Sequence, residues 1–192
     1  MVNLFPNFRL MNEDLDIGQS ATLTDLAMCI NHYRLSTPGL YVCVHIPVQL
    51  DAETRLTPGI VAQVNSGRFK QCEPGDYSHF TGPPNFVLDV FKEGEQEKYQ
   101  NRREPYEQAG VLECVAWIGQ SKNSLVWNRL IDGAYQEVEA DDEGLIKSSA
   151  LPGLWMPLDA VTQRDWWRVM ATISRGITRQ EHHAFMGSIW KT

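Results

Sequence analysis

An acidic residue lies in the middle of a segment that reads as a buried strand, NFVLDVF at residues 85–91. Successive side chains of a β-strand point to opposite faces, so Asp89 shares its face with Val87 and Phe91. Burying an unpaired carboxylate among such neighbours is strongly unfavourable. We therefore expect Asp89 to be paired with a base, protonated, or bound to a metal ion.

Four basic residues follow Asp89 in the sequence, Lys92, Lys98, Arg102 and Arg103, and the last three could pair with it. The last three lie in a charged segment, 93–109, that is expected to form a helix ending at Gly110. The same basic residues could line a phosphate-binding cleft. Five acidic residues are interspersed among them, and this mixture favours a solvated helix face.

The elements around Asp89 predict an α/β fold with a mixed sheet. Apolar and alternating runs predict strands at 40–51, 59–64, 85–91 and 111–118. The helix at 93–109 separates the last two strands, and such a strand–helix–strand unit is typical of a parallel crossover. Pro47 places the first strand at an edge, or at a position that needs no ladder donor.

Capping and turn residues predict two further boundaries. Residues 1–20 read as an irregular lead-in, and the first helix is expected to begin at Thr22, with Asp25 as its capping-box-like partner. Asp132-Gly133 is a strong hairpin-turn sequence, and it separates predicted strands at 124–132 and 134–141.

The C-terminal region predicts two helices, one centred on 164–173 and one that begins at Thr178, where Glu181 would complete a capping box. His182 and His183 are neighbours that cannot converge on one metal ion, so we interpret both as surface residues. Three tryptophans, Trp155, Trp166 and Trp167, could stack on bases. More often such residues bury a helix against the sheet or a partner, and a homodimer interface in this region is a reasonable hypothesis.

The composition limits the class of protein. The chain has 192 residues, 43% of them hydrophobic, which suits one well-cored domain. It has neither an apolar run of membrane-spanning length nor a signal-peptide pattern, and its four scattered cysteines fit a reducing cytoplasm. The net charge of −7 argues against a nonspecific nucleic-acid coat protein, although a nuclease with a local basic cleft stays possible.

Four stretches of the sequence resemble the Uma-two family, a group of restriction endonuclease domains with the PD-(D/E)xK nuclease fold. They are GPPNFVLDV at 82–90, NRREPYEQAGVLE at 101–113, the hairpin around Asp132-Gly133, and LPGLWMPLDAV at 151–161. The resemblance implies a restriction-endonuclease-like mixed sheet flanked by helices, in a domain that spans residues 1–161. Residues 162–192 would form a helical extension, packed on that domain or on a partner.

The resemblance also implies a site. In this fold two acidic residues on adjacent strands hold Mg²⁺, helped by a main-chain carbonyl next to the second acid, and the metal activates water for attack on a DNA phosphate. Asp89 matches the second acid, and the carbonyl of Val90 would be the neighbouring ligand.

The sequence departs from the family pattern at three places. Gly59 stands where the first acid is expected, and Phe91 stands where the lysine of the motif is expected. The lysine that often moves to the helix, four residues before a tyrosine, is Arg102 here, four residues before Tyr106. Glu113, on the next predicted strand, could replace the lost acid if its side chain shares the face of Asp89.

Two hypotheses remain open at this stage. In the first, the protein is a Mg²⁺-dependent DNA endonuclease in which Asp89 and Glu113 hold the metal and Arg102 stabilises the phosphate charge. In the second, it is a nuclease-derived protein without catalysis that acts as a binding or interaction module, and Asp89 is a structural acid paired with a nearby base. Gly59 and Phe91 favour the second hypothesis, and Asp89 favours the first.

Overall fold

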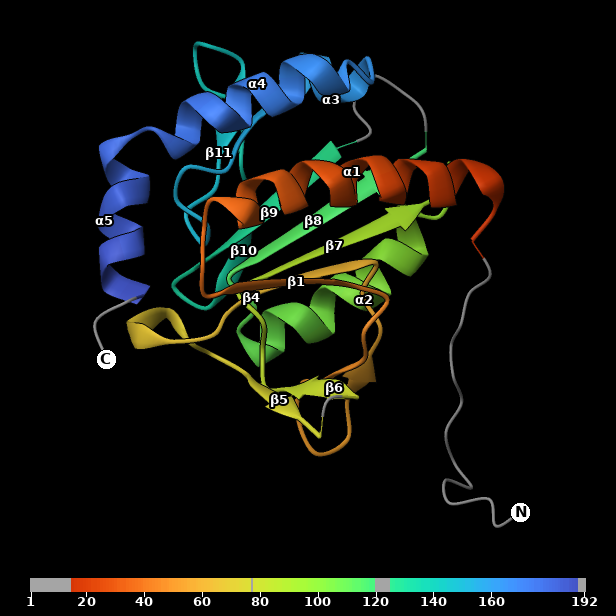
Figure 1. Ribbon diagram of the computed structural model, residues 1–192. Coiled ribbons are helices and arrows are strands. Elements are labelled where there is room, and N and C mark those ends of the chain that lie inside the picture. The colour runs from red at the N-terminus through yellow and green to blue at the C-terminus, as the bar shows by residue number, and fades with distance from the viewer. Residues whose placement is uncertain (1–14, 77, 120–124, 190–192) are drawn as a thin grey trace.

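The computed structural model describes residues 15–76, 78–119 and 125–189 of the chain. In these residues the central feature is a six-stranded mixed sheet ordered β1-β4-β7-β8-β9-β10. Its strands are β1 (Leu40–Val44), β4 (Ile60–Val64), β7 (Phe86–Phe91), β8 (Glu113–Ile118), β9 (Leu125–Ile131) and β10 (Ala134–Glu137). Helix α1 (Ile17–Leu35) covers one face of the sheet and α2 (Gln96–Ala109) the other (Figure 1). The expected α/β fold with a mixed sheet is confirmed.

Smaller elements complete the described part of the chain. A four-stranded sheet, ordered β3-β2-β6-β5, consists of β2 (Val48–Gln49), β3 (Arg55–Leu56), β5 (Glu73–Gly75) and β6 (His79–Thr81). Strands β11 (Leu145–Lys147) and β12 (Trp155–Pro157) pair with each other. The remaining helices are the 3-10 helix η1 (Gly67–Phe69), α3 (Leu158–Thr162), α4 (Trp166–Ile177) and α5 (Gln180–Ile189).

The parallel pair β7–β8 is the one that the strand–helix–strand unit predicts, and α2 makes the crossover. In its register Asp89 aligns with Ala116, and Phe86 aligns with Glu113. Aligned residues of neighbouring strands share a face, and residues an odd number of positions apart along one strand point to opposite faces. The register therefore directs the side chains of Asp89 and Glu113 to opposite faces of the sheet.

Helix α1 begins five residues before the predicted start, and this corrects the expectation at Thr22. Its N-cap is Asp16, whose carboxylate accepts the backbone N–H of Gln19 at 2.9 Å, while the Gln19 amide oxygen accepts the backbone N–H of Asp16 at 3.1 Å. This reciprocal capping box fixes the first turn. Thr22 is buried inside the helix and donates its hydroxyl hydrogen to the Gly18 carbonyl at 2.9 Å. Residues 1–14 of the predicted lead-in lie outside the described residues.

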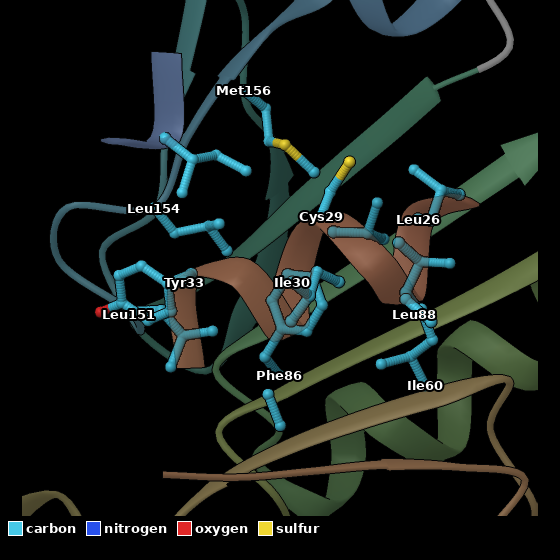
Figure 2. Close-up of a cluster of buried hydrophobic side chains, with 14 of the residues drawn as sticks. Leu26, Cys29, Ile30, Tyr33, Ile60, Phe86, Leu88, Leu151, Leu154 and Met156 are labelled. Carbon is cyan, nitrogen blue, oxygen red and sulfur yellow. The ribbon is translucent and has the colours of Figure 1, made fainter. Parts of the chain in front are cut away.

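The main core lies between α1 and the sheet (Figure 2). Side chains of α1, β4, β7 and the segment before α3 meet there: Leu26, Cys29, Ile30, Tyr33, Ile60, Phe86, Leu88, Leu151, Leu154 and Met156. Helices α4 and α5 add Val169, Ile173, Phe185 and Ile189 to the same cluster. Burying each large apolar side chain contributes roughly 1.5–3 kcal/mol. The C-terminal helices are thus part of the packing that holds α1 against the sheet.

The predicted strand 40–51 is interrupted after Val44, which is a correction. His45 adopts a left-handed backbone conformation with φ of 52°, and the chain leaves the main sheet there. Residues Val48 and Gln49 then join the smaller sheet as β2. The hairpin at Asp132-Gly133 is confirmed, because both residues have positive φ, 51° and 84°, as a tight two-residue turn between β9 and β10 requires. Ser124, at the start of the predicted strand, lies outside the described residues.

The C-terminal region also differs from expectation at two residues. Thr178 caps the end of α4, and α5 begins at Gln180, so Glu181 forms no capping box and instead accepts the indole N–H of Trp155 at 2.7 Å. His182 is buried, with 3% of its surface exposed, because α5 packs this face against Tyr33 and Gly153. His183 is exposed as expected. Among the described residues, no helix combines the length and apolar character needed to cross a membrane.

Candidate functional site

Asp89 lies on the face of β7 that α2 covers, close to the point where β4 begins. Strand β4 pairs with β7 from Leu88 to Phe86, so the residue that faces Asp89 comes just before β4. That residue is Gly59, whose backbone N–H donates to Asp89 Oδ1 at 2.8 Å. The Asp89 side chain is only 10% exposed. A charged carboxylate this deeply buried needs donors on both of its oxygens.

The second oxygen of Asp89 is held by two residues from one face of α2. Arg102 Nε donates to Asp89 Oδ2 at 3.2 Å, and the Tyr106 hydroxyl donates to the same oxygen at 3.1 Å. Residues four positions apart lie on one face of a helix, so the spacing of Arg102 and Tyr106 is what brings both to Asp89. Arg102 Nη2 also donates to the Thr57 carbonyl at 2.6 Å, which ties α2 to the segment before β4.

The role of Tyr106 as a hydrogen-bond donor to Asp89 was not predicted from the sequence, where Tyr106 only marked the position of Arg102 four residues earlier. It is fully buried, and burial raises the pKa of its hydroxyl well above the ordinary value, reinforced by the negative charge of Asp89. The Arg102 guanidinium opposes this rise of the Tyr106 pKa. The hydroxyl consequently stays protonated and donates to Asp89. The sequence feature that indicates this role is the position of Tyr106 one helical turn after Arg102, which places both side chains on the same face of α2.

The other two bases that could have paired with Asp89 have different partners. Lys98 Nζ lies 2.8 Å from Glu95 Oε1, near the exposed start of α2. Arg103 points along the other side of α2, where Nη2 donates to the Tyr135 carbonyl at 3.3 Å and Nη1 lies 3.6 Å from Glu107 Oε2. Arg102 is thus the base that the fold delivers to Asp89.

Glu113 does not reach this site, which corrects the expectation that it could replace the missing acid. Its side chain is fully buried on the α1 face of the sheet, as the β7–β8 register requires. Arg129 Nε donates to Glu113 Oε1 at 3.1 Å, and the backbone N–H of Ser149 donates to the same oxygen at 2.9 Å. The hydroxyls of Ser148 and Ser149 donate as well. Glu113 therefore anchors the chain after β11 to the sheet.

The carbonyl of Val90, the expected main-chain ligand, is engaged by α1. Gln19 Nε2 donates to it at 3.3 Å. Gln19 is the same residue that completes the capping box of α1. The carbonyl thus accepts a hydrogen bond from the helix start.

Comparison with known proteins identifies the family of this chain. The Uma2 family, described as "Putative restriction endonuclease", matches residues 16–159. The chain belongs to the Uma2 family. Among solved structures, the fold is similar to a "putative nuclease belonging to DUF820 from Anabaena variabilis", with a TM-score of 0.53, 8% sequence identity, and 83% of each chain covered. No curated protein matches the sequence.

The sequence resemblance led us to expect the first acid at Gly59, and the surrounding packing leaves no room for a side chain there. A Cβ atom on Gly59 would lie 2.9 Å from the Leu88 carbonyl oxygen and 2.9 Å from Leu23 Cδ1. The first of these atoms belongs to the backbone of β7 and the second to α1, so neither side has room for the added atom. An acid at this position would thus require the backbone to shift.

The residues around Asp89 do not fit the divalent metal ion that the Uma2 family implies. Mg²⁺ selects oxygen ligands, usually one or two carboxylates with several waters. Here both oxygens of Asp89 accept hydrogen bonds, and one of the donors is the cationic guanidinium of Arg102. Among the described residues, no group of three or more His, Cys, Asp or Glu side chains could hold a metal ion. Phe91, where the resemblance led us to expect the lysine of the motif, is buried against Tyr99, with ring centroids 5.8 Å apart.

Proposed function

We propose that this Uma2 protein is a nuclease-derived interaction protein that does not cleave DNA, and that Arg102 serves as a built-in cation in place of the family's metal ion. The observation that carries the proposal is the set of three donors on Asp89: the Gly59 N–H, the Arg102 guanidinium and the Tyr106 hydroxyl. These donors satisfy the carboxylate within the fold, and a positive charge already lies beside it.

Electrostatics support this proposal. A divalent cation that bound Asp89 would have to displace Arg102 or lie next to it, and two positive charges a few ångströms apart repel strongly in a site with little water. Displacing Arg102 would also break its hydrogen bond to the Thr57 carbonyl. Breaking one partner away from a buried ion pair is strongly unfavourable. To bind, a metal ion must offset the charge repulsion, the lost hydrogen bond to Thr57 and the broken ion pair.

The protonation states point the same way. Cleavage of a phosphodiester by water needs a group that accepts the water's proton or a metal that acidifies the water. Arg102 stays protonated at any physiological pH and cannot accept that proton. Tyr106 has a raised pKa and donates its hydrogen to Asp89, so it is not a base either.

The alternative function is a Mg²⁺-dependent DNA endonuclease, and the observation that favours it is the match of the Uma2 family, described as "Putative restriction endonuclease", to residues 16–159. In that case Asp89 would hold the ion, and Arg102 would swing away to grip the DNA phosphate. The two functions differ in whether the protein cleaves DNA: the endonuclease does, and the interaction protein does not.

A plasmid cleavage assay distinguishes them. Supercoiled and linear DNA are incubated with the wild-type chain in Mg²⁺ or Mn²⁺, beside the Asp89→Asn variant prepared identically. Our proposal predicts that wild type and variant leave the DNA equally intact. Nicking by wild type that disappears in Asp89→Asn would overturn it and establish the endonuclease.

We further infer that the protein acts in a reducing compartment such as the cytoplasm. All four cysteines are free thiols, and three of them are buried. Free buried thiols without disulfides are characteristic of proteins in such compartments. Mass spectrometry after alkylation under native and denaturing conditions tests this: protein from cells should carry four alkylatable thiols once denatured.

A further inference from the structure

The two edges of the main sheet differ in how their backbone groups are satisfied. At the β10 edge, the Tyr135 N–H donates to the Glu107 carboxylate, and the Tyr135 carbonyl accepts from Arg103 Nη2 at 3.3 Å. Both side chains come from α2, and they form an ion pair with each other. Side chains that occupy outward backbone groups prevent another strand from pairing there. Side chains of α2 therefore occupy the outward backbone groups of β10 at Tyr135.

The β1 edge has no such cover in the part of the chain that the structure describes. Strand β1 pairs with β4 alone and lies at the open margin of the sheet (Figure 1). The bonds from Asn65 N–H to the Gly39 carbonyl and from His45 N–H to the Gly59 carbonyl fix the ladder. In an antiparallel ladder these bonds recur at every second residue, so the backbone groups of Val42 and Val44 point away from β4.

The outward groups of β1 are ready to pair. No described residue donates to or accepts from the backbone of Val42 or Val44. On either side of this edge, Tyr41 is 47% exposed and Val44 is 46% exposed. The strand LYVCV contains no charged residue, proline or glycine, the features that usually protect an edge from pairing.

We propose that β1 is a homodimer interface, in which the β1 strands of two copies pair antiparallel about a two-fold axis at Val42 and join the two sheets into one. In this register Val42 N–H donates to the partner's Val42 carbonyl, and Val44 N–H donates to the partner's Leu40 carbonyl. Each bond occurs twice by symmetry. The Leu40 N–H keeps its own bond to the Thr37 carbonyl, at 3.1 Å.

Two features favour a second copy over a foreign strand at this edge: the symmetry of an antiparallel strand pair and the absence of charged residues on β1. An antiparallel strand pair is self-complementary, so one open edge on each chain generates a closed dimer. The two-fold axis pairs each β1 edge with the other, so the assembly stops at two copies. Two chains that each carry a net charge of −7 repel each other. Strand β1 has no charged residue, so pairing at β1 adds no direct charge repulsion at the two-fold axis. This inference does not depend on whether the protein cleaves DNA.

The test compares the mass of the full-length chain in solution with that of two variants, by light scattering coupled to size exclusion. Val42→Pro removes the outward N–H without touching the ladder to β4, since an edge strand tolerates proline where its N–H faces out. The matched control is Trp167→Lys, which removes a large apolar side chain away from β1, 80% exposed on α4. Circular dichroism and thermal melting establish that each variant is folded.

We expect wild type and Trp167→Lys to elute with twice the 21.8 kDa chain mass, and Val42→Pro to elute as a folded monomer. Two lost hydrogen bonds at the dyad correspond to a dissociation constant raised about 100-fold. If Val42→Pro misfolds, the double variant Tyr41→Lys/Val44→Lys replaces it and should also be monomeric. A monomeric wild type, or a dimer that survives in Val42→Pro and dissociates in Trp167→Lys, would overturn the proposal.

Discussion

Arg102 Nε lies 3.2 Å from Asp89 Oδ2, in an ion pair between helix α2 and strand β7. Both side chains are largely buried: Asp89 is 10% exposed and Arg102 is 19% exposed. The pair joins α2 to β7, and the bond from Arg102 to the Thr57 carbonyl extends it to the segment before β4. The pair therefore holds α2, β7 and the segment before β4 together.

The first prediction concerns the removal of Arg102. The Arg102→Met variant leaves the Asp89 carboxylate buried without its cation, so we expect the free energy of unfolding to fall by about 3–5 kcal/mol. Urea denaturation measures this fall. The double variant Asp89→Asn/Arg102→Met should recover a large part of the loss, because its neutral amide needs no counter-charge. Equal losses in the single and double variants would show that the pair itself is not what stabilises this joint.

The second prediction concerns the position of the missing acid. Gly59→Ala places a Cβ atom 2.9 Å from both the Leu88 carbonyl oxygen and Leu23 Cδ1, so we expect a destabilisation of about 1–3 kcal/mol. Gly187→Ala is the matched control, because nothing lies near its Cβ in helix α5 and alanine should stabilise that helix by about 0.5–1 kcal/mol. Thermal melts of the two variants should therefore shift in opposite directions. A Gly59→Ala protein as stable as wild type would mean that the site can readmit a side chain.

The third prediction separates Glu113 from the Asp89 site. Glu113→Ala leaves Arg129 and two serine hydroxyls without their buried acceptor, and we expect a loss of about 3–5 kcal/mol in unfolding free energy. The control Glu104→Ala removes an exposed acid and should change the stability by less than about 0.5 kcal/mol. A stable Glu113→Ala protein that has lost metal binding would contradict the assignment of Glu113 as a structural anchor.

The fourth prediction is a dependence of stability on pH that originates at His182. Burial lowers the pKa of this imidazole below its ordinary value, and the neighbouring His183 lowers it further. A histidine with a lowered pKa binds protons more weakly in the folded state, so its contribution is complete above the unfolded pKa of about 6.5. That contribution is lost as the pH falls from there through the lowered folded pKa.

The measurement is the melting temperature between pH 8 and pH 5 for wild type and His182→Gln. We expect the variant to show a shallower fall on acidification than wild type. His45→Asn, a substitution at an exposed histidine, serves as the control and should keep the wild-type slope. Identical slopes for wild type and His182→Gln would assign the acid sensitivity to other groups.

Much of the fold could be predicted because it depends on local patterns. The parallel β7–β8 unit follows from two apolar runs separated by a charged helix, and the Asp132-Gly133 turn follows from its dipeptide. The pairing of Asp89 with Arg102 was one of the predicted alternatives, since their spacing depends on one strand and one helix. The start of α1 also has a local signal, because Asp16 and Gln19 have the spacing of a capping box, as Thr22 and Asp25 do six residues later.

The remaining features depend on how distant segments pack. Whether Glu113 shares a face with Asp89 is decided by the register of β8 against β7, and a one-residue difference reverses the answer. The burial of His182 depends on the docking of α5 against Tyr33 and Gly153, which lie far away in the sequence. The end of β1 depends on the left-handed conformation of His45, which no turn dipeptide announces.

The most direct test of the central claim is a calorimetric titration of the wild-type chain and of Asp89→Asn with Mn²⁺ and Mg²⁺, which requires no assumption about the DNA target. We predict that the two proteins give the same weak, unsaturable heats, because the Arg102 guanidinium already neutralises Asp89. Saturable binding to wild type that is absent in Asp89→Asn would contradict the account and make Asp89 a metal ligand.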